Sequence, residues 1–153
     1  PQKPIMGTTG EVTFKMKGEF FTSEECGAIK LEKDGVISFQ LVAHAGELPF
    51  LKRSINLIVP DSFEGRGVYG RKTAETSLRG NYTKVERHIL QSCRADESGG
   101  QLIVAIYDEE RRTISGAFTM TVKDEDTGEI IEIKDGWFKN VGLIVSKIIP
   151  SVE

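Results

Sequence analysis

Apolar and polar residues alternate along most of this chain, so that every second side chain belongs to the same class. The alternation is clearest in TISGAFTMTV, residues 113–122, where threonine and serine stand between the apolar positions. A period of two residues is typical of a β-strand that buries one face and exposes the other. We therefore expect buried faces made of Val12, Phe14 and Met16; Ile37, Phe39 and Leu41; Ile55, Leu57 and Val59; Leu102, Val104 and Ile106; and Ile114, Phe118, Met120 and Val122.

Turn-forming residues separate the alternating segments. EKDGV, ESGGQ, DEERRT and DTGEI each place glycine or charged residues between two apolar runs. Such joints are typical of hairpins, in which glycine supplies the positive φ of a tight turn. Asp135-Gly136, in KDGWF, is a further turn dipeptide by the same criterion.

Residues 72–92 follow the alternation least well. They contain a hint of helical spacing that Gly80-Asn81 interrupts, and we interpret them as a long excursion with one further strand around Tyr82 to Leu90. The prediction is a flexible leader over residues 1–10 and one all-β domain over residues 11–153. That domain is either an antiparallel β-sandwich or a partly closed β-barrel, built mainly of hairpins.

Composition and charge narrow the classes of function. The chain has 153 residues, a net charge of -3 and a pI near 5.5. This balance gives no overall attraction to nucleic acid, which we therefore do not expect as a partner. No apolar run is long enough to cross a bilayer, and the polar start PQKPIMGTTG lacks the pattern of a signal peptide.

The acidic stretch DEDTGE raises the question of a metal site. Asp124, Asp126 and Glu129 would offer oxygen ligands to calcium, but the spacing of an EF-hand loop is absent. The stretch lies between two strongly alternating segments and contains Gly128, which suits a tight turn. We predict a hairpin here, and neither a metal nor a cofactor.

Catalytic chemistry has few candidates in this sequence. His44 and His88 are the two histidines, and no serine or cysteine near either forms a recognisable nucleophile motif. A carbohydrate-active enzyme is a less favoured alternative, because its carboxylate pair would have to come from turns. We therefore predict that the protein is not an enzyme.

Aromatic and basic side chains are the better candidates, as parts of a contact surface. We expect Trp137 and Tyr69 to serve as aromatic platforms, with Arg66, Arg71 and Arg79 as polar anchors. For the tryptophan, a stacking platform for a sugar ring and an anchor in the core are the two alternatives. The basic residues would suit an acidic partner or a polyanion groove, or would simply face solvent.

The two cysteines leave two alternatives open. Cys26 and Cys93 lack the close spacing of a zinc or redox motif. They form either one long-range disulfide or two unlinked thiols, and the sequence does not place their Cα atoms within bonding reach.

The last third of the chain resembles a family of small all-β domains found in cell-envelope lipoproteins of Bacteroidota. The likeness rests on GGQLIVAIYDEERRTISGAFTMTVKDEDTGEIIEIKDGWF, which is similar to that family's Gly-led strand, charged turn, ISG-x-F strand, TGE hairpin and DG-x-F strand. Upstream, SINLIVPDSFEGRGVYG and EVTFKMKGEFFTS resemble its earlier strands, whereas the basic middle from about Lys72 to Ser98 departs from it. The function of that family is unassigned, and it contributes no site residues.

This resemblance implies an exported protein of the cell envelope, on the periplasmic or cell-surface side of the outer membrane. It would be attached to the membrane only through a lipid anchor absent from this chain, and export would favour the disulfide alternative. We expect a binding or accessory module that contacts an outer-membrane protein complex or a glycan. The alternative is a small-ligand carrier with an apolar barrel lumen.

Overall fold

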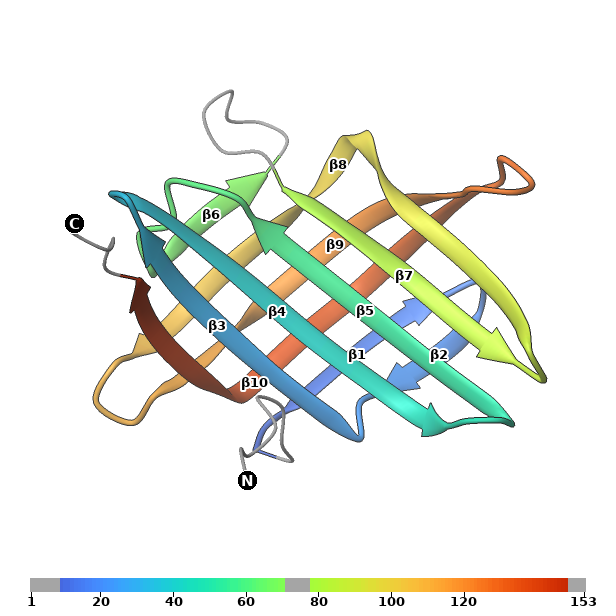
Figure 1. Ribbon diagram of the computed structural model, residues 1–153, viewed down its shortest axis with the longest axis horizontal. Helices are drawn as coiled ribbons and strands as arrows, with labels where there is room; N and C mark the ends of the chain where they lie inside the picture. The colour runs from blue at the N-terminus through green and yellow to red at the C-terminus, as the bar shows by residue number, and fades with distance from the viewer. Residues whose placement is uncertain (1–8, 71–77, 149–153) are drawn as a thin grey trace, which may run out of the picture.

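The computed structural model describes residues 9–70 and 78–148, which form strands and loops without a helix (Figure 1). In these ranges no helix is long and apolar enough to cross a membrane. Most of the predicted leader, residues 1–8, lies outside the described ranges. The strands are β1 (Glu11–Met16), β2 (Glu19–Thr22), β3 (Glu25–Lys33), β4 (Val36–Glu47), β5 (Leu51–Val59), β6 (Gly67–Gly70), β7 (Arg79–Glu86), β8 (Ile89–Asp108), β9 (Thr113–Asp124) and β10 (Ile130–Ile148).

Hydrogen-bonded strands form a closed ring in the order β3, β4, β5, β7, β8, β9, β10 and back to β3. The hairpin of β1 and β2 lies beside the first part of β10, and β6 lies beside the second part of β8. Among the described pairs, only β10 with β3 is parallel. The fold is therefore all-β and built mainly of hairpins, as predicted, and its strands close into a flattened barrel of two layers (Figure 1).

Strand β8 joins the two layers because it changes neighbours along its length. Its first part pairs with β7 and its second part with β6. Between these parts the register with β9 shifts from Ala95 to Gly100, and Gly99 has a φ of 60°. The predicted hairpin at ESGGQ is therefore wrong: the glycines bend one continuous strand. Glycine suits both structures because it adopts the positive φ that a tight turn or a bulge requires.

Aromatic rings occupy much of the space between the layers. Phe14 stacks on Phe21 with 4.5 Å between ring centroids, and it meets Tyr82 and Phe118 edge-on. A second stack consists of Phe39, Phe63 and Tyr69. These rings contribute large apolar areas and directional ring contacts, so they dominate the packing of the interior.

The predicted buried faces are confirmed at nearly every position. Ile37 is half-buried and packs against the core. Ile106 is the exception and is exposed, because a register shift after Val104 reverses the alternation of β8. The pattern of period two therefore predicts the inward face correctly wherever a strand stays regular.

The region 72–92 contains a strand, but with bounds other than those predicted. β7 ends at Glu86, and a turn at Arg87 and His88, with φ values of 48° and 72°, leads into β8. Gly80 does not interrupt the structure. A Cβ atom at this position would lie 2.7 Å from the Met120 sulfur, so glycine allows β7 to pass close to the core.

The stretch DEDTGE forms the turn between β9 and β10, which confirms the hairpin prediction. Asp124 is 5% exposed, and its carboxylate accepts hydrogen bonds from Gln91 Nε2 at 2.9 Å and from the backbone N–H of Asp126 and Thr127. No group of three or more metal-ligating side chains gathers among the described residues. The carboxylate therefore closes the turn, as side chains of aspartate commonly do.

Acid should destabilise the protein in part through Asp124. The hydrogen bond from Gln91, followed by those from the backbone, lowers the pKa of this carboxyl below its ordinary 3.8. A carboxyl with a lowered folded pKa stabilises the fold above its unfolded pKa, and this stabilisation is lost as the pH falls through the folded value. Below about pH 4, we expect the melting temperature of the wild-type protein to fall more steeply than that of Asp124→Asn. Circular dichroism melts over a pH series measure this, and equal slopes would contradict it.

The two cysteines are free, buried thiols, so of the two alternatives that the sequence left open the structure has the unlinked thiols. The strand registers place Cys26, Ala43, Ile55, Tyr82 and Cys93 in one row across five strands. Neighbouring strands lie about 4.8 Å apart, so four steps separate the thiols far beyond the roughly 7 Å that a disulfide spans between Cα atoms. Burial raises both pKa values, that of Cys93 to about 11, so the thiols stay protonated at neutral pH.

Candidate functional site

Trp137 lies on the outward face of β10, with 61% of its surface exposed. Regular alternation from the buried Ile133 would point it inward instead. However, the register with β9 shifts between Ile133 and Gly136, and one extra residue, Asp135, faces outward. This β-bulge reverses the alternation, so that Trp137 turns to solvent and Phe138 enters the core.

The bulge depends on Gly136, and the predicted turn at Asp135-Gly136 is wrong because both residues lie inside β10. Asp135 has a φ of 50°, which is the left-handed region. A Cβ atom on Gly136 would lie 2.5 Å from the carbonyl oxygen of Phe118 and 2.7 Å from its ring. Only glycine fits this close approach, so the packing of β9 against β10 fixes the place of the bulge.

The tryptophan belongs to a row of outward residues that crosses four strands. It pairs with Ala117 of β9, which pairs with Ile103 of β8, which pairs with Val68 of β6. The small Ala117 lies between bulkier side chains, and a hollow of about 200 Å³ opens beside it. We call this hollow the Trp137 surface, and its outward side chains are Gln101, Ile103, Ala117, Thr119, Asp135 and Trp137.

Polar groups surround the apolar centre of the Trp137 surface. Gln101 pairs with Thr119 in the next outward row of β8 and β9. On the β10 side, the carboxylate of Asp135 lies 3.8 Å from the Lys15 ammonium, and both side chains are mostly exposed. An exposed ion pair of this kind contributes little to stability, so the carboxylate is free to accept hydrogen bonds from a ligand. The surface therefore combines a flat indole with an amide, a hydroxyl and a carboxylate.

Tyr69 does not belong to this surface, although the sequence analysis predicted an exposed platform. It is 4% exposed and stacks on Phe63 with 5.1 Å between ring centroids. Its hydroxyl donates to the carbonyl of Gly65 at 2.7 Å and accepts from the backbone N–H of Glu64. The prediction for this residue is wrong because its inward position in β6 places it in the core.

The two predicted arginines that the structure describes, Arg66 and Arg79, do not lie beside Trp137 either. Arg79 is exposed at the start of β7, where it pairs with Ile58 of β5. Both strands belong to the layer opposite the one that carries Trp137 (Figure 1). Arg66 is exposed just before β6, with β8 and β9 between that strand and β10. Arg71 lies outside the described residues. Of the four predicted contact residues that the structure describes, only Trp137 belongs to the hollow.

Sequence reasoning missed the residues that surround the tryptophan, namely Gln101, Ile103, Thr119 and Asp135. Three of them are outward positions of the strands that alternation predicts, so the class of position was recognisable. Their proximity was not, because it depends on the register between strands far apart in sequence. Asp135 was missed because its dipeptide has the composition of a turn and the structure of a bulge.

Comparison with known proteins places the chain in a family without an assigned function. The family model described as "Domain of unknown function (DUF6252)" matches residues 8–142. This span includes β1 to β9 and the part of β10 that carries Trp137. No curated protein and no solved structure matches the chain.

Proposed function

For this chain, which belongs to the DUF6252 domain family, we propose a non-enzymatic role as a glycan-binding module that uses the Trp137 surface. The observation that carries the proposal is the exposed indole of Trp137 beside a hollow with polar side chains on its rim. An exposed indole offers a partner a large flat contact surface, and here a bulge turns it outward.

The chemistry of the hollow fits a sugar ring. A pyranose has an apolar face of C–H groups, which stacks on an indole, and a rim of hydroxyls, which both donate and accept hydrogen bonds. Asp135 accepts such bonds, whereas Gln101 and Thr119 can do both. The small side chain of Ala117 leaves room for the ring between Trp137 and Ile103.

The glycan-binding module would act within a cell-envelope lipoprotein, outside the cytoplasm. This part of the proposal is supported by the resemblance of GGQLIVAIYDEERRTISGAF and the following hairpin to lipoprotein domains. A role as an accessory subunit of an outer-membrane complex is consistent with the same surface. The aromatic stacks between the layers favour a surface site over the alternative of a carrier with an apolar lumen.

Replacing the indole tests the proposal. We expect Trp137→Ala to weaken binding to its best glycan by about tenfold or more, because truncation of a central aromatic anchor commonly costs about 2 kcal/mol. A glycan array with the soluble domain would identify the ligand, and calorimetry would then measure the variant. The melting temperature should change little, since the side chain is exposed.

Phe20→Ala is the matched control, because Phe20 is an exposed aromatic on β2, with β1 between that strand and β10, and it does not line the hollow. It should bind the glycan like the wild type. A protein that binds no glycan on the array, but copurifies with an outer-membrane protein through Trp137, would replace the glycan by a protein partner. Equal glycan affinities for Trp137→Ala and wild type would remove the site.

A further inference from the structure

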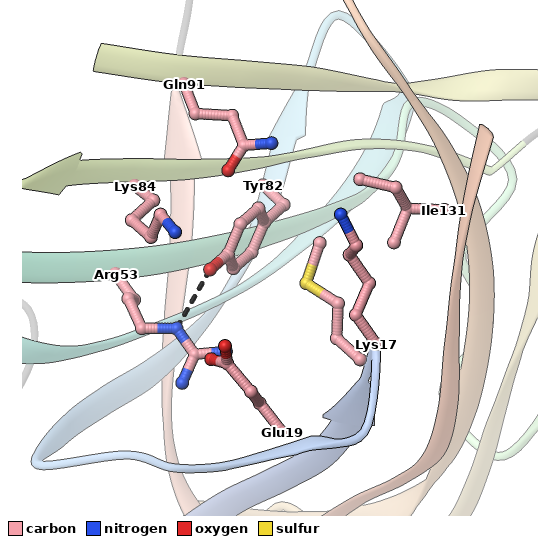
Figure 2. A pocket seen from close by; sticks show the side chains of 8 residues that line it. Lys17, Glu19, Arg53, Tyr82, Lys84, Gln91 and Ile131 are labelled. Atoms are coloured by element: carbon pink, nitrogen blue, oxygen red, sulfur yellow. Dashed lines mark hydrogen bonds between the residues drawn. The ribbon is translucent and has the colours of Figure 1, made fainter. Parts of the chain in front are cut away.

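A second cavity, of about 190 Å³, lies at one end of the space between the layers (Figure 2). It is separate from the Trp137 surface, since the two share no residue. We call it the Arg53 pocket, and its lining residues are Met16, Lys17, Glu19, Arg53, Tyr82, Lys84, Gln91 and Ile131.

Charged side chains point into this pocket from positions that are apolar elsewhere in the barrel. Arg53 of β5 pairs with Lys84 of β7, which pairs with Gln91 of β8. The next row inward consists of Ile55, Tyr82 and Cys93, which are buried and pair with one another in the same order. Each of them lies two residues along its strand from the pocket residue on that strand. Side chains two residues apart share a face, so the row of pocket residues continues the inward face of the barrel toward its mouth.

Arg53 is held in place by hydrogen bonds and by ring contacts. Its Nε donates a 2.8 Å hydrogen bond to the Tyr82 hydroxyl, drawn in Figure 2, and its guanidinium lies over the rings of Phe21 and Tyr82. One terminal nitrogen also contacts the carbonyl of Phe20 at 3.5 Å. Among the residues that the structure describes, no carboxylate forms an ion pair with Arg53. Within the described part of the chain, three of its five N–H groups have no acceptor and are left for a ligand.

Lys84 adds a second positive charge directly opposite Arg53. Like charges at paired positions of an antiparallel sheet repel each other. Among the described residues, Lys84 forms an ion pair with Glu86, whose carboxylate lies 4.0 Å away and is more than half exposed, so this pair offsets little of the repulsion from Arg53. Lys17, by contrast, has its own partner, Glu129, at 3.1 Å. An anion that binds between Arg53 and Lys84 would therefore relieve a repulsion built into the free protein.

We propose that the Arg53 pocket binds the carboxylate group of a small organic acid. The planar fork of a guanidinium matches a carboxylate, and Lys84 adds a second positive charge next to it. The side chains of Met16 and Ile131 and the ring of Tyr82 provide apolar contacts for the body of the acid. Glu19, the carboxylate in the lining, would repel a doubly charged phosphate more strongly than a singly charged acid.

Benzoate and its neutral analogue benzamide are the probes for this proposal. Titration of the ¹⁵N-labelled protein should shift the amide signals of β5, β7 and β8 near the pocket with benzoate and not with benzamide. Arg53→Gln and Lys84→Gln should each weaken benzoate binding by about ten- to a hundredfold, as the loss of a charge-assisted hydrogen bond implies. Lys52→Gln is the matched control, because Lys52 neighbours Arg53 on the opposite face of β5 and pairs with Val85.

Thermal stability separates binding from a purely structural role. Arg53→Gln also loses ring contacts and is expected to melt lower, whereas Lys84→Gln removes a like-charge repulsion and should melt no lower than the wild type. Weaker benzoate binding by a Lys84→Gln protein of undiminished stability would support the proposal. Equal shifts with benzoate and benzamide, unchanged affinity in both variants, or saturable binding of inorganic phosphate without benzoate would each overturn it.

Discussion

Phe14→Ala is expected to lower the free energy of unfolding by about 3–5 kcal/mol, because it removes the ring at the centre of the core. Phe14 is fully buried on β1, and its ring meets those of Phe21, Tyr82 and Phe118. Its neighbours come from three other strands, so the cavity left by alanine cannot be closed by a shift of one strand alone. Urea unfolding followed by far-UV circular dichroism measures the loss.

Phe20→Ala provides the matched comparison, since Phe20 carries the same side chain on the neighbouring strand β2 but is 59% exposed. Its effect should stay within about 0.5 kcal/mol. A loss of 3–5 kcal/mol is a large fraction of the stability of a domain, so Phe14→Leu serves as a milder variant if the alanine variant fails to fold. Similar losses for Phe14→Ala and Phe20→Ala would contradict the assignment of the core.

The inward faces were predictable because the period of a strand is a local property. Phe39, Leu41, Ile55 and Leu57 are all buried as the alternation indicates, without any knowledge of which strands are neighbours. Period two also extends from Ile55 back to Arg53, so the same rule would have placed this arginine inside. A charged residue on a predicted inward face is therefore the signal that the sequence offered for the Arg53 pocket.

Corners and irregular residues were not predictable in the same way. Ser98–Gly100 and Asp135-Gly136 have the composition of turns, yet one bends β8 and the other makes a bulge in β10. The turn at Arg87 and His88 lacks the glycine or asparagine that usually supplies a positive φ, so its position carried no signal. Composition reports that the chain departs from an extended strand, and only the neighbouring strands determine how.

The Trp137 surface was only partly predictable, because it also depends on a bulge and on the registers between strands. The tryptophan stood out as the single indole of the chain, but its outward direction results from a bulge that regular alternation opposes. Its neighbours Ile103 and Ala117 reach it only through the registers of β8, β9 and β10. A site on a sheet face is made of one residue from each of several strands, so no short motif in the sequence contains it.

Gly116→Ala should be among the most damaging small substitutions in the barrel, with an expected loss of about 3 kcal/mol or more. Gly116 is buried in β9, where a Cβ atom would collide with the backbone carbonyl of Ile103 and lie 2.6 Å from the Phe138 ring. Neither neighbour can yield freely, since the carbonyl belongs to the next strand and the ring to the core. Gly142→Ala is the matched control in β10, because its Cβ atom would meet only the Thr9 side chain, at 3.8 Å. That variant should unfold within about 0.5 kcal/mol of the wild type. If both substitutions were equally tolerated in urea unfolding, β8 and β9 could not approach each other as closely as the ring of strands requires.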